Sequence, residues 1–173
     1  MGAPQHGGEV QAMNASIGGT ARSRPALAGP VVVAIDASEP ARWGLTLAAR
    51  LVVPLAVPIV ALHVRHVPVV SADAATIPDV EAALERAQAA AEAMAGEALA
   101  GLNWRFEVAS GLIGPAIIER AEAMHADLIV VGAHRHSVLH NIFVGSTTLH
   151  LVDHSPIPVL IARQGRLTSS NLT

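Results

Sequence analysis

A glycine followed by three hydroxyl residues, Gly145-Ser146-Thr147-Thr148, begins a predicted helix near the end of the chain. Glycine lets a ligand approach the backbone closely. Hydroxyl groups, free N–H groups and the positive end of the helix dipole can bind an anion there. Gly132, which ends a predicted apolar strand, could admit the same ligand from the other side. The pattern indicates an anion cradle, although a helix cap with two turn glycines accounts for it equally well.

Histidines form a second group of residues that could do chemistry. His134, His136 and His140 fall in one predicted loop, and His150 and His154 lie one helical turn apart beyond it. Imidazole clusters bind divalent metals. However, no Glu-x-x-His motif accompanies the pair, and the loop spacing fits no familiar metal motif. We therefore expect solvated loop histidines and no metal site.

Two more polar residues end predicted strands. Asp36 follows the first strand, where it would either contact a ligand or form an Asx turn before the next helix. His63 lies near the end of the second strand and is predicted to be a partly buried structural residue. The chain contains no G-x-G-x-x-G turn after the first strand, no P-loop and no nucleophile elbow. These absences exclude a standard dinucleotide domain, a P-loop enzyme and an α/β-hydrolase.

Alternating apolar runs and helix-forming runs must position these residues. Strands with continuous apolar runs are typical of a parallel sheet that is buried on both faces, and strand–helix alternation predicts a doubly wound α/β fold. Ser38 is predicted to cap the first helix, which Pro54 closes. Strands are predicted at 31–35, 60–64, 104–109, 128–131 and 159–162, and the later helices at 79–102, 114–125 and 146–153.

Composition limits the function classes. The chain has 173 residues, of which 51% are hydrophobic and 2% aromatic, and a formal net charge of -3. This balance gives no basis for nucleic-acid binding, and no apolar run approaches the length of a membrane span. With no cysteine and no apolar signal segment, we expect a cytoplasmic protein. We also expect a flexible leader at 1–29, one domain at 30–163 and a flexible tail at 164–173.

Several segments together resemble the universal stress protein family. They are "VVVAIDAS" with its Asp36, "ALHV", "ADLIVVGAH" and "VGSTTLHLVDHSPIPVLIA". The resemblance implies a five-stranded parallel sheet of order 3-2-1-4-5 and a homodimer formed through the last strand. It also implies that the protein binds ATP as a cofactor, together with Mg. It implies a regulatory role in the stress response rather than an enzyme, with no catalytic residues.

The resemblance also implies which residues would hold the nucleotide. Asp36 and the backbone near Ala34 and Ile35 would hold the adenosine, and the Val64 backbone would contact adenine. The ribose and phosphates would be surrounded by Gly132, Ala133, His134, Gly145, Ser146, Thr147 and Thr148.

The family's ATP motif has a glycine, a second glycine three residues later, and a Gly-Ser or Gly-Thr pair after nine more residues. Gly132 and the pair Gly145-Ser146 match its two ends, and Arg135 replaces the middle glycine. Arginine does not readily adopt the backbone conformations open to glycine, and its bulk could block a phosphate. Alternatively, its guanidinium could bind phosphate with two hydrogen bonds. The first possibility leads to a dimeric interaction module with a degenerate site, and the second to a nucleotide-binding regulator. A slow ATPase is a weaker third possibility, because only Asp36 and the histidines could serve as a base.

Overall fold

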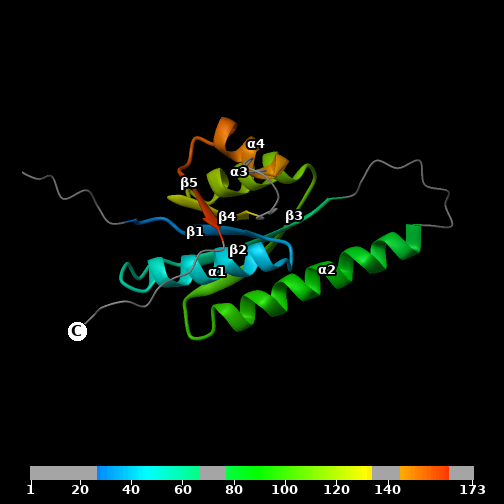
Figure 1. Ribbon diagram of the computed structural model, residues 1–173, viewed down its shortest axis with the longest axis horizontal. Helices are drawn as coiled ribbons and strands as arrows, with labels where there is room; N and C mark the ends of the chain where they lie inside the picture. The colour runs from blue at the N-terminus through cyan, green and yellow to red at the C-terminus, as the bar shows by residue number, and fades with distance from the viewer. Residues whose placement is uncertain (1–26, 67–76, 134–144, 164–173) are drawn as a thin grey trace, which may run out of the picture.

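Apolar runs form the strands and alanine-rich runs form the helices of the computed structural model, which describes residues 27–66, 77–133 and 145–163 (Figure 1). All strands of the five-stranded sheet are parallel, in the order β3-β2-β1-β4-β5. The predicted doubly wound fold and strand order are therefore confirmed. In chain order the elements are β1 (Val31–Ile35), α1 (Glu39–Val52), β2 (Ile59–Arg65), α2 (Ile77–Ala98), β3 (Trp104–Ser110), α3 (Ile113–Ala123), β4 (Leu128–Ala133), α4 (Ser146–His154) and β5 (Val159–Arg163).

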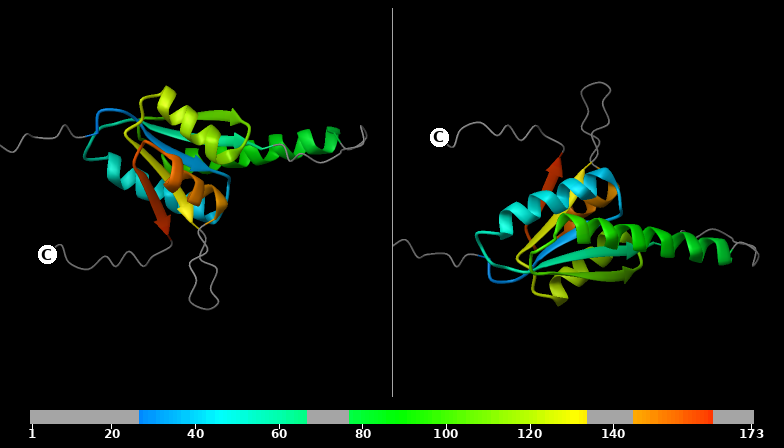
Figure 2. Two further views of the ribbon diagram at one scale, coloured as in Figure 1. Left: turned by 90° about the horizontal axis from the view of Figure 1, so that it is seen from above. Right: turned by 90° about the horizontal axis from the view of Figure 1, so that it is seen from below.

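Different pairs of helices cover the two faces of the sheet (Figures 1 and 2). Because side chains alternate along a strand, Val31, Val33 and Ile35 of β1 pack into the layer of α1 and α2. Val32 and Ala34 pack into the layer of α3 and α4. A ligand that touches Ala34 therefore lies in the α3–α4 layer.

Helix ends differ from the predictions by a few residues. α2 spans Ile77–Ala98 rather than 79–102, and α3 spans Ile113–Ala123 rather than 114–125. After α2 the backbone turns through Gly101 at a φ of 79°. A left-handed residue of this kind commonly follows a helix end, and it cannot be located from helix-forming composition alone.

The folded domain begins before the predicted boundary at residue 30. Leu27 packs against the core of the α1–α2 layer. Oδ2 of Asp127 accepts the backbone N–H groups of Ala28 and Gly29, both at 2.6 Å. Residues 27–29 therefore contact the domain. The rest of the predicted leader and the predicted tail lie outside the described residues.

Candidate functional site

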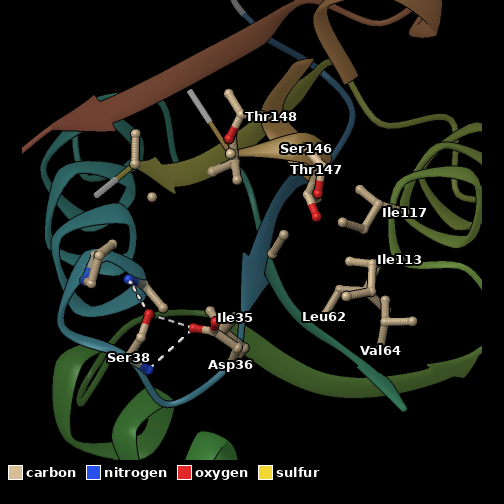
Figure 3. Close-up of a pocket in the computed structure, with 17 residues that line it drawn as sticks. Ile35, Asp36, Ser38, Leu62, Val64, Ile113, Ile117, Ser146, Thr147 and Thr148 are labelled. Atoms are coloured by element: carbon tan, nitrogen blue, oxygen red, sulfur yellow. Dashed lines mark hydrogen bonds between the residues drawn. The ribbon is translucent and has the colours of Figure 1, made fainter. Parts of the chain in front are cut away.

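A cavity of about 220 Å³ opens at the carboxyl ends of β1, β2 and β4, beside the first turns of α3 and α4 (Figure 3). Parallel α/β sheets bind ligands at this edge, where the strand order reverses. His134 and Arg135, which were also predicted as site residues, lie outside the described residues. All the other predicted site residues line the cavity, namely Ala34, Ile35, Asp36, Val64, Gly132, Ala133, Gly145, Ser146, Thr147 and Thr148.

Sequence reasoning missed the apolar wall of the cavity. Leu62 lies two residues before Val64, so the alternation of side chains along β2 could have placed it on the same face. Ile113 and Ile117 of α3 face the cavity (Figure 3), but nothing in the sequence separates them from ordinary core residues. The missed lining residues are Leu62, Val131, Ile113 and Ile117, together with Ser38, Pro40 and Ala41 at the start of α1.

Asp36 shapes the turn between β1 and α1 with the side chain of Ser38. Its Oδ1 accepts the Ser38 N–H at 3.1 Å and also the Ser38 hydroxyl. The Ser38 hydroxyl oxygen in turn accepts the N–H of Ala41 at 3.4 Å, as expected for a helix cap. This network stabilises Ala37 in the left-handed region, at a φ of 60°. Asp36 thus forms the predicted Asx turn, and its exposed carboxylate still borders the cavity.

The two glycines of the predicted cradle have different surroundings. A Cβ on Gly132 would lie 2.1 Å from the carbonyl oxygen of Pro40. Gly132 is therefore needed for the close approach of α1 to β4, and only its backbone borders the cavity. Among the described residues, a Cβ on Gly145 would meet no atom within 4 Å. The missing side chain of Gly132 therefore makes room for α1, whereas that of Gly145 leaves space on the side of the described residues.

The start of α4 brings N–H groups to the cavity that the helix itself does not use. Gly145 precedes the helix at a φ of -58° and a ψ of 156°, without a side-chain cap, and the first turn has no acidic residue. The first helical bond runs from the Leu149 N–H to the Gly145 carbonyl, at 3.0 Å. The three preceding N–H groups therefore have no partner within the helix, and the positive end of its dipole lies here. Among the described lining residues only Asp36 carries a formal charge.

His63 supports the site from the other layer of the sheet. It is only 6% exposed, and its Nδ1–H donates to the carbonyl oxygen of Ile35 at 3.0 Å. A carbonyl can only accept, so Nδ1 of His63 carries a hydrogen. The bond holds the end of β1, directly before Asp36. The prediction of a structural histidine is confirmed.

The histidine pair of α4 does not have the geometry of a metal chelate. The rings of His150 and His154 stack with their centroids 4.3 Å apart and their planes 13° apart. Parallel stacked rings direct their nitrogen lone pairs side by side rather than toward one ion. Within residues 27–66, 77–133 and 145–163, no three His, Cys, Asp or Glu side chains are grouped so that they could hold a metal. His134, His136 and His140 lie outside these ranges. None of the described helices is long and apolar enough to cross a membrane.

Comparisons with solved structures place the fold among stress proteins. The universal stress protein UspA from Lactobacillus plantarum is 27% identical with a TM-score of 0.67, over 78% of this chain and 97% of that one. A universal stress protein in complex with cAMP is 22% identical with a TM-score of 0.54, over 80% and 99% of the two chains. A family member from Arabidopsis thaliana with AMP bound is 17% identical with a TM-score of 0.55, over 80% and 93%. At these identities the last two show the fold alone.

A search of curated proteins finds no match. The chain does match the Universal stress protein family over residues 28–163, a span that includes the whole described sheet and every lining residue of the cavity. The match starts at Ala28, which the structure also includes in the folded domain. The chain therefore belongs to the universal stress protein family.

Proposed function

We propose that this protein binds an adenine nucleotide in the cavity and acts as a small dimeric regulator of the stress response. One observation carries the proposal: an apolar wall and an uncapped helix start border the same cavity. A nucleotide has the matching division between an apolar base and an anionic phosphate. The universal stress proteins solved with cAMP and with AMP support the same ligand class.

The base would occupy the apolar part of the cavity. Leu62, Val64, Ile113 and Ile117 surround this part (Figure 3), and burial of a flat base against them is favourable. The backbone of Val64 would contact the adenine edge. Asp36 and the backbone of Ala34 and Ile35 would hold the adenosine.

The phosphates would lie at the start of α4. Ser146, Thr147 and Thr148 offer hydroxyl groups and N–H groups there, and Gly145 leaves open space beside them. The backbone of Gly132 and Ala133 would close the other side, and His134 would lie next to it in sequence. Arg135 follows His134 in sequence, and its guanidinium would bind the phosphates of a triphosphate such as ATP, with or without Mg.

Calorimetric titration tests the nucleotide proposal directly. ATP, AMP and cAMP are titrated into the purified protein, with GTP as a control for base selectivity. Mass spectrometry of the denatured protein identifies any nucleotide that co-purifies. Binding of at least one adenine nucleotide, with GTP weaker, is expected. If no adenine nucleotide binds, the nucleotide proposal fails and the dimeric interaction module remains.

Arg135→Gly separates the two roles of the arginine. If the guanidinium grips phosphate, the variant should bind ATP more weakly and with less dependence on salt, because an ion pair is lost. If the arginine blocks the cavity, the variant should bind more tightly. Titrations of both proteins at two salt concentrations measure the sign of the change.

The alternative function, a dimeric interaction module, draws support from the free edge of the sheet. Of the strands that the structure describes, only β4 pairs with β5, and the side chains of Val159, Leu160 and Ile161 are half-buried. Leu149 and Val152 of α4 are also exposed, at 50% and 54%. An apolar edge strand readily pairs with another chain, so we propose a homodimer through β5 in either case.

A further inference from the structure

Gly114 of α3 and His150 of α4 are in direct contact. A Cβ on Gly114 would lie 2.4 Å from Cδ2 of His150 and 3.1 Å from its Cβ. Rotation about χ1 could move the imidazole ring, but it would not move the Cβ of His150. The overlap with the ring is the severe one, whereas the approach to the Cβ requires a shift of only a few tenths of an ångström.

The imidazole of His150 makes a second contact, with His154. Its ring stacks on His154 at a centroid distance of 4.3 Å. His154 is itself fixed, because its Nδ1–H donates to the backbone carbonyl of His150 at 3.0 Å. The ring of His150 therefore contacts both Gly114 and His154, and the stack restricts the space into which the ring can turn.

The turns that meet at this contact also line the cavity. Ile113 and Ile117, which are lining residues, lie on either side of Gly114 along α3. Ser146 and Thr147 lie one helical turn before His150 and border the proposed phosphate site. The spacing of α3 and α4 at Gly114 therefore fixes the distance between the apolar wall and the uncapped helix start.

We propose that Gly114 and His150 form a spacer that sets the width of the cavity, with Gly114 as a positioning residue for the nucleotide. This inference rests on the proposed nucleotide binding. Neither residue lines the cavity. They act through Ile113 and Thr147, which the contact holds at the separation that a bound nucleotide needs on both sides at once.

A double-mutant cycle tests the spacer. Gly114→Ala should weaken adenine nucleotide binding by about tenfold or more, because overpacking forces the helices to shift. His150→Ala should also weaken binding, by about threefold, because the helices lose the ring that keeps them apart. Gly114→Ala/His150→Ala should recover most of the lost affinity, because the second change makes room for the new methyl group. Recovery by removing a side chain is a result that general destabilisation would not produce.

Gly96→Ala is the matched control. Gly96 lies within α2, where a Cβ would come no closer than 3.9 Å to Trp104. It should fold and bind nucleotide like the unmodified protein, and circular dichroism confirms the folding of each variant. The spacer is wrong if Gly114→Ala binds as tightly as the unmodified protein, or if His150→Ala fails to rescue it. If the unmodified protein binds no adenine nucleotide, the proposed function itself fails, and the spacer's role in binding fails with it.

Discussion

Gly132 and Gly145 match two glycines of the family's ATP motif, yet a glycine is needed at each position for a different physical reason. Gly132 makes room for the carbonyl of Pro40, so its requirement lies in the packing of α1 on the sheet. Gly145 has no positive φ, and a Cβ there would meet no atom of the described residues within 4 Å, so the described part of the fold does not require a glycine there. Its requirement, if the proposed function holds, comes from the ligand.

The two glycines should therefore respond differently to alanine. Gly132→Ala should lower the free energy of unfolding by about 1–3 kcal/mol, because a Cβ overpacks the start of α1. Gly145→Ala should change it by less than about 0.5 kcal/mol, since the new methyl group meets open space. Urea denaturation measures both. Equal losses in the two variants would contradict this division.

Gly145→Val extends the comparison to binding. The larger side chain should fill the space that the phosphates need and abolish nucleotide binding in the titration described above. The thermal midpoint should stay close to that of the unmodified protein. A variant that keeps its affinity would show that the phosphates lie elsewhere.

The polar half of the site could be predicted from the sequence, whereas the apolar half could not. Asp36 and the Gly145–Thr148 segment interrupt apolar runs and carry donors or charge, so their residue types set them apart. Ile113 and Ile117 look like any core residues of a helix. Only the tertiary structure distinguishes a side chain that borders a cavity from one that packs against a neighbour.

At the scale of elements, Glu107 connects the edge strand β3 to α3. Its Oε1 accepts the Nε–H of Arg105 at 2.8 Å, and its Oε2 accepts an N–H of Arg120 in α3. Burial alone would raise the pKa of the Glu107 carboxyl. The hydrogen bonds and positive charges of the two arginines outweigh burial and hold the pKa below its ordinary value.

The stability that Glu107 contributes should depend on pH, and the variant Glu107→Gln should reveal this dependence. At pH 7 the free energy of unfolding of the variant should be lower by about 1 kcal/mol, because the ion pairs of Glu107 with Arg105 and Arg120 are lost. A lowered folded pKa adds stability above the unfolded value of about 4.3, and this stability is lost as the pH falls through the folded pKa. The difference between the proteins should therefore be constant near neutral pH and disappear in acid.

Urea denaturation at a series of pH values measures this difference. Glu122→Gln is the control, because Glu122 is exposed on α3, the helix that carries Arg120, and forms no ion pair within the described part of the chain. Its stability should follow that of the unmodified protein. A Glu107→Gln difference that grows in acid would contradict the assignment.

The helices and strands could be predicted because a strand that is buried on both faces of the sheet has an apolar sequence throughout. The strand Val31–Ile35 is apolar throughout and was predicted at its observed bounds. Ser38 and Pro54 flank α1. Ser38 accepts a backbone N–H group at the start of the helix, and Pro54 has no N–H group with which to continue it. The end of α2 was missed, because the helix-forming residues Leu99 and Ala100 continue past its last residue, Ala98, up to Gly101, where the chain turns.

At the scale of the whole molecule, residues Leu27–Gly29 should stabilise the domain through their contacts with it. Deletion of residues 1–26 should leave the thermal midpoint nearly unchanged. Deletion of residues 1–29 should lower the free energy of unfolding by about 1–3 kcal/mol, because the Asp127 carboxylate loses two N–H partners. Calorimetric melting of both truncated proteins measures the contrast. Equal midpoints would show that Leu27–Gly29 add no stability.

Association through β5 is the other prediction at this scale. Val152→Glu should convert the proposed homodimer to a monomer at micromolar concentration, because it puts a charge on the exposed apolar surface of α4 beside the edge strand. Val53→Glu is the matched control, since Val53 is exposed at the end of α1, at 64%. Light scattering measures the mass of each protein. A monomeric unmodified protein would rule out the homodimer.

The separation of the two layers also determines what the protein's own fluorescence can report. The chain has 2 tryptophans and no tyrosine. Trp104 packs with the α1–α2 layer and Trp43 is part of α1, whereas the proposed base site lies across the sheet in the α3–α4 layer. Neither indole lines the cavity, so a bound nucleotide would not quench them by contact. A change in emission on adding nucleotide would therefore mean that binding had moved the opposite layer of the domain.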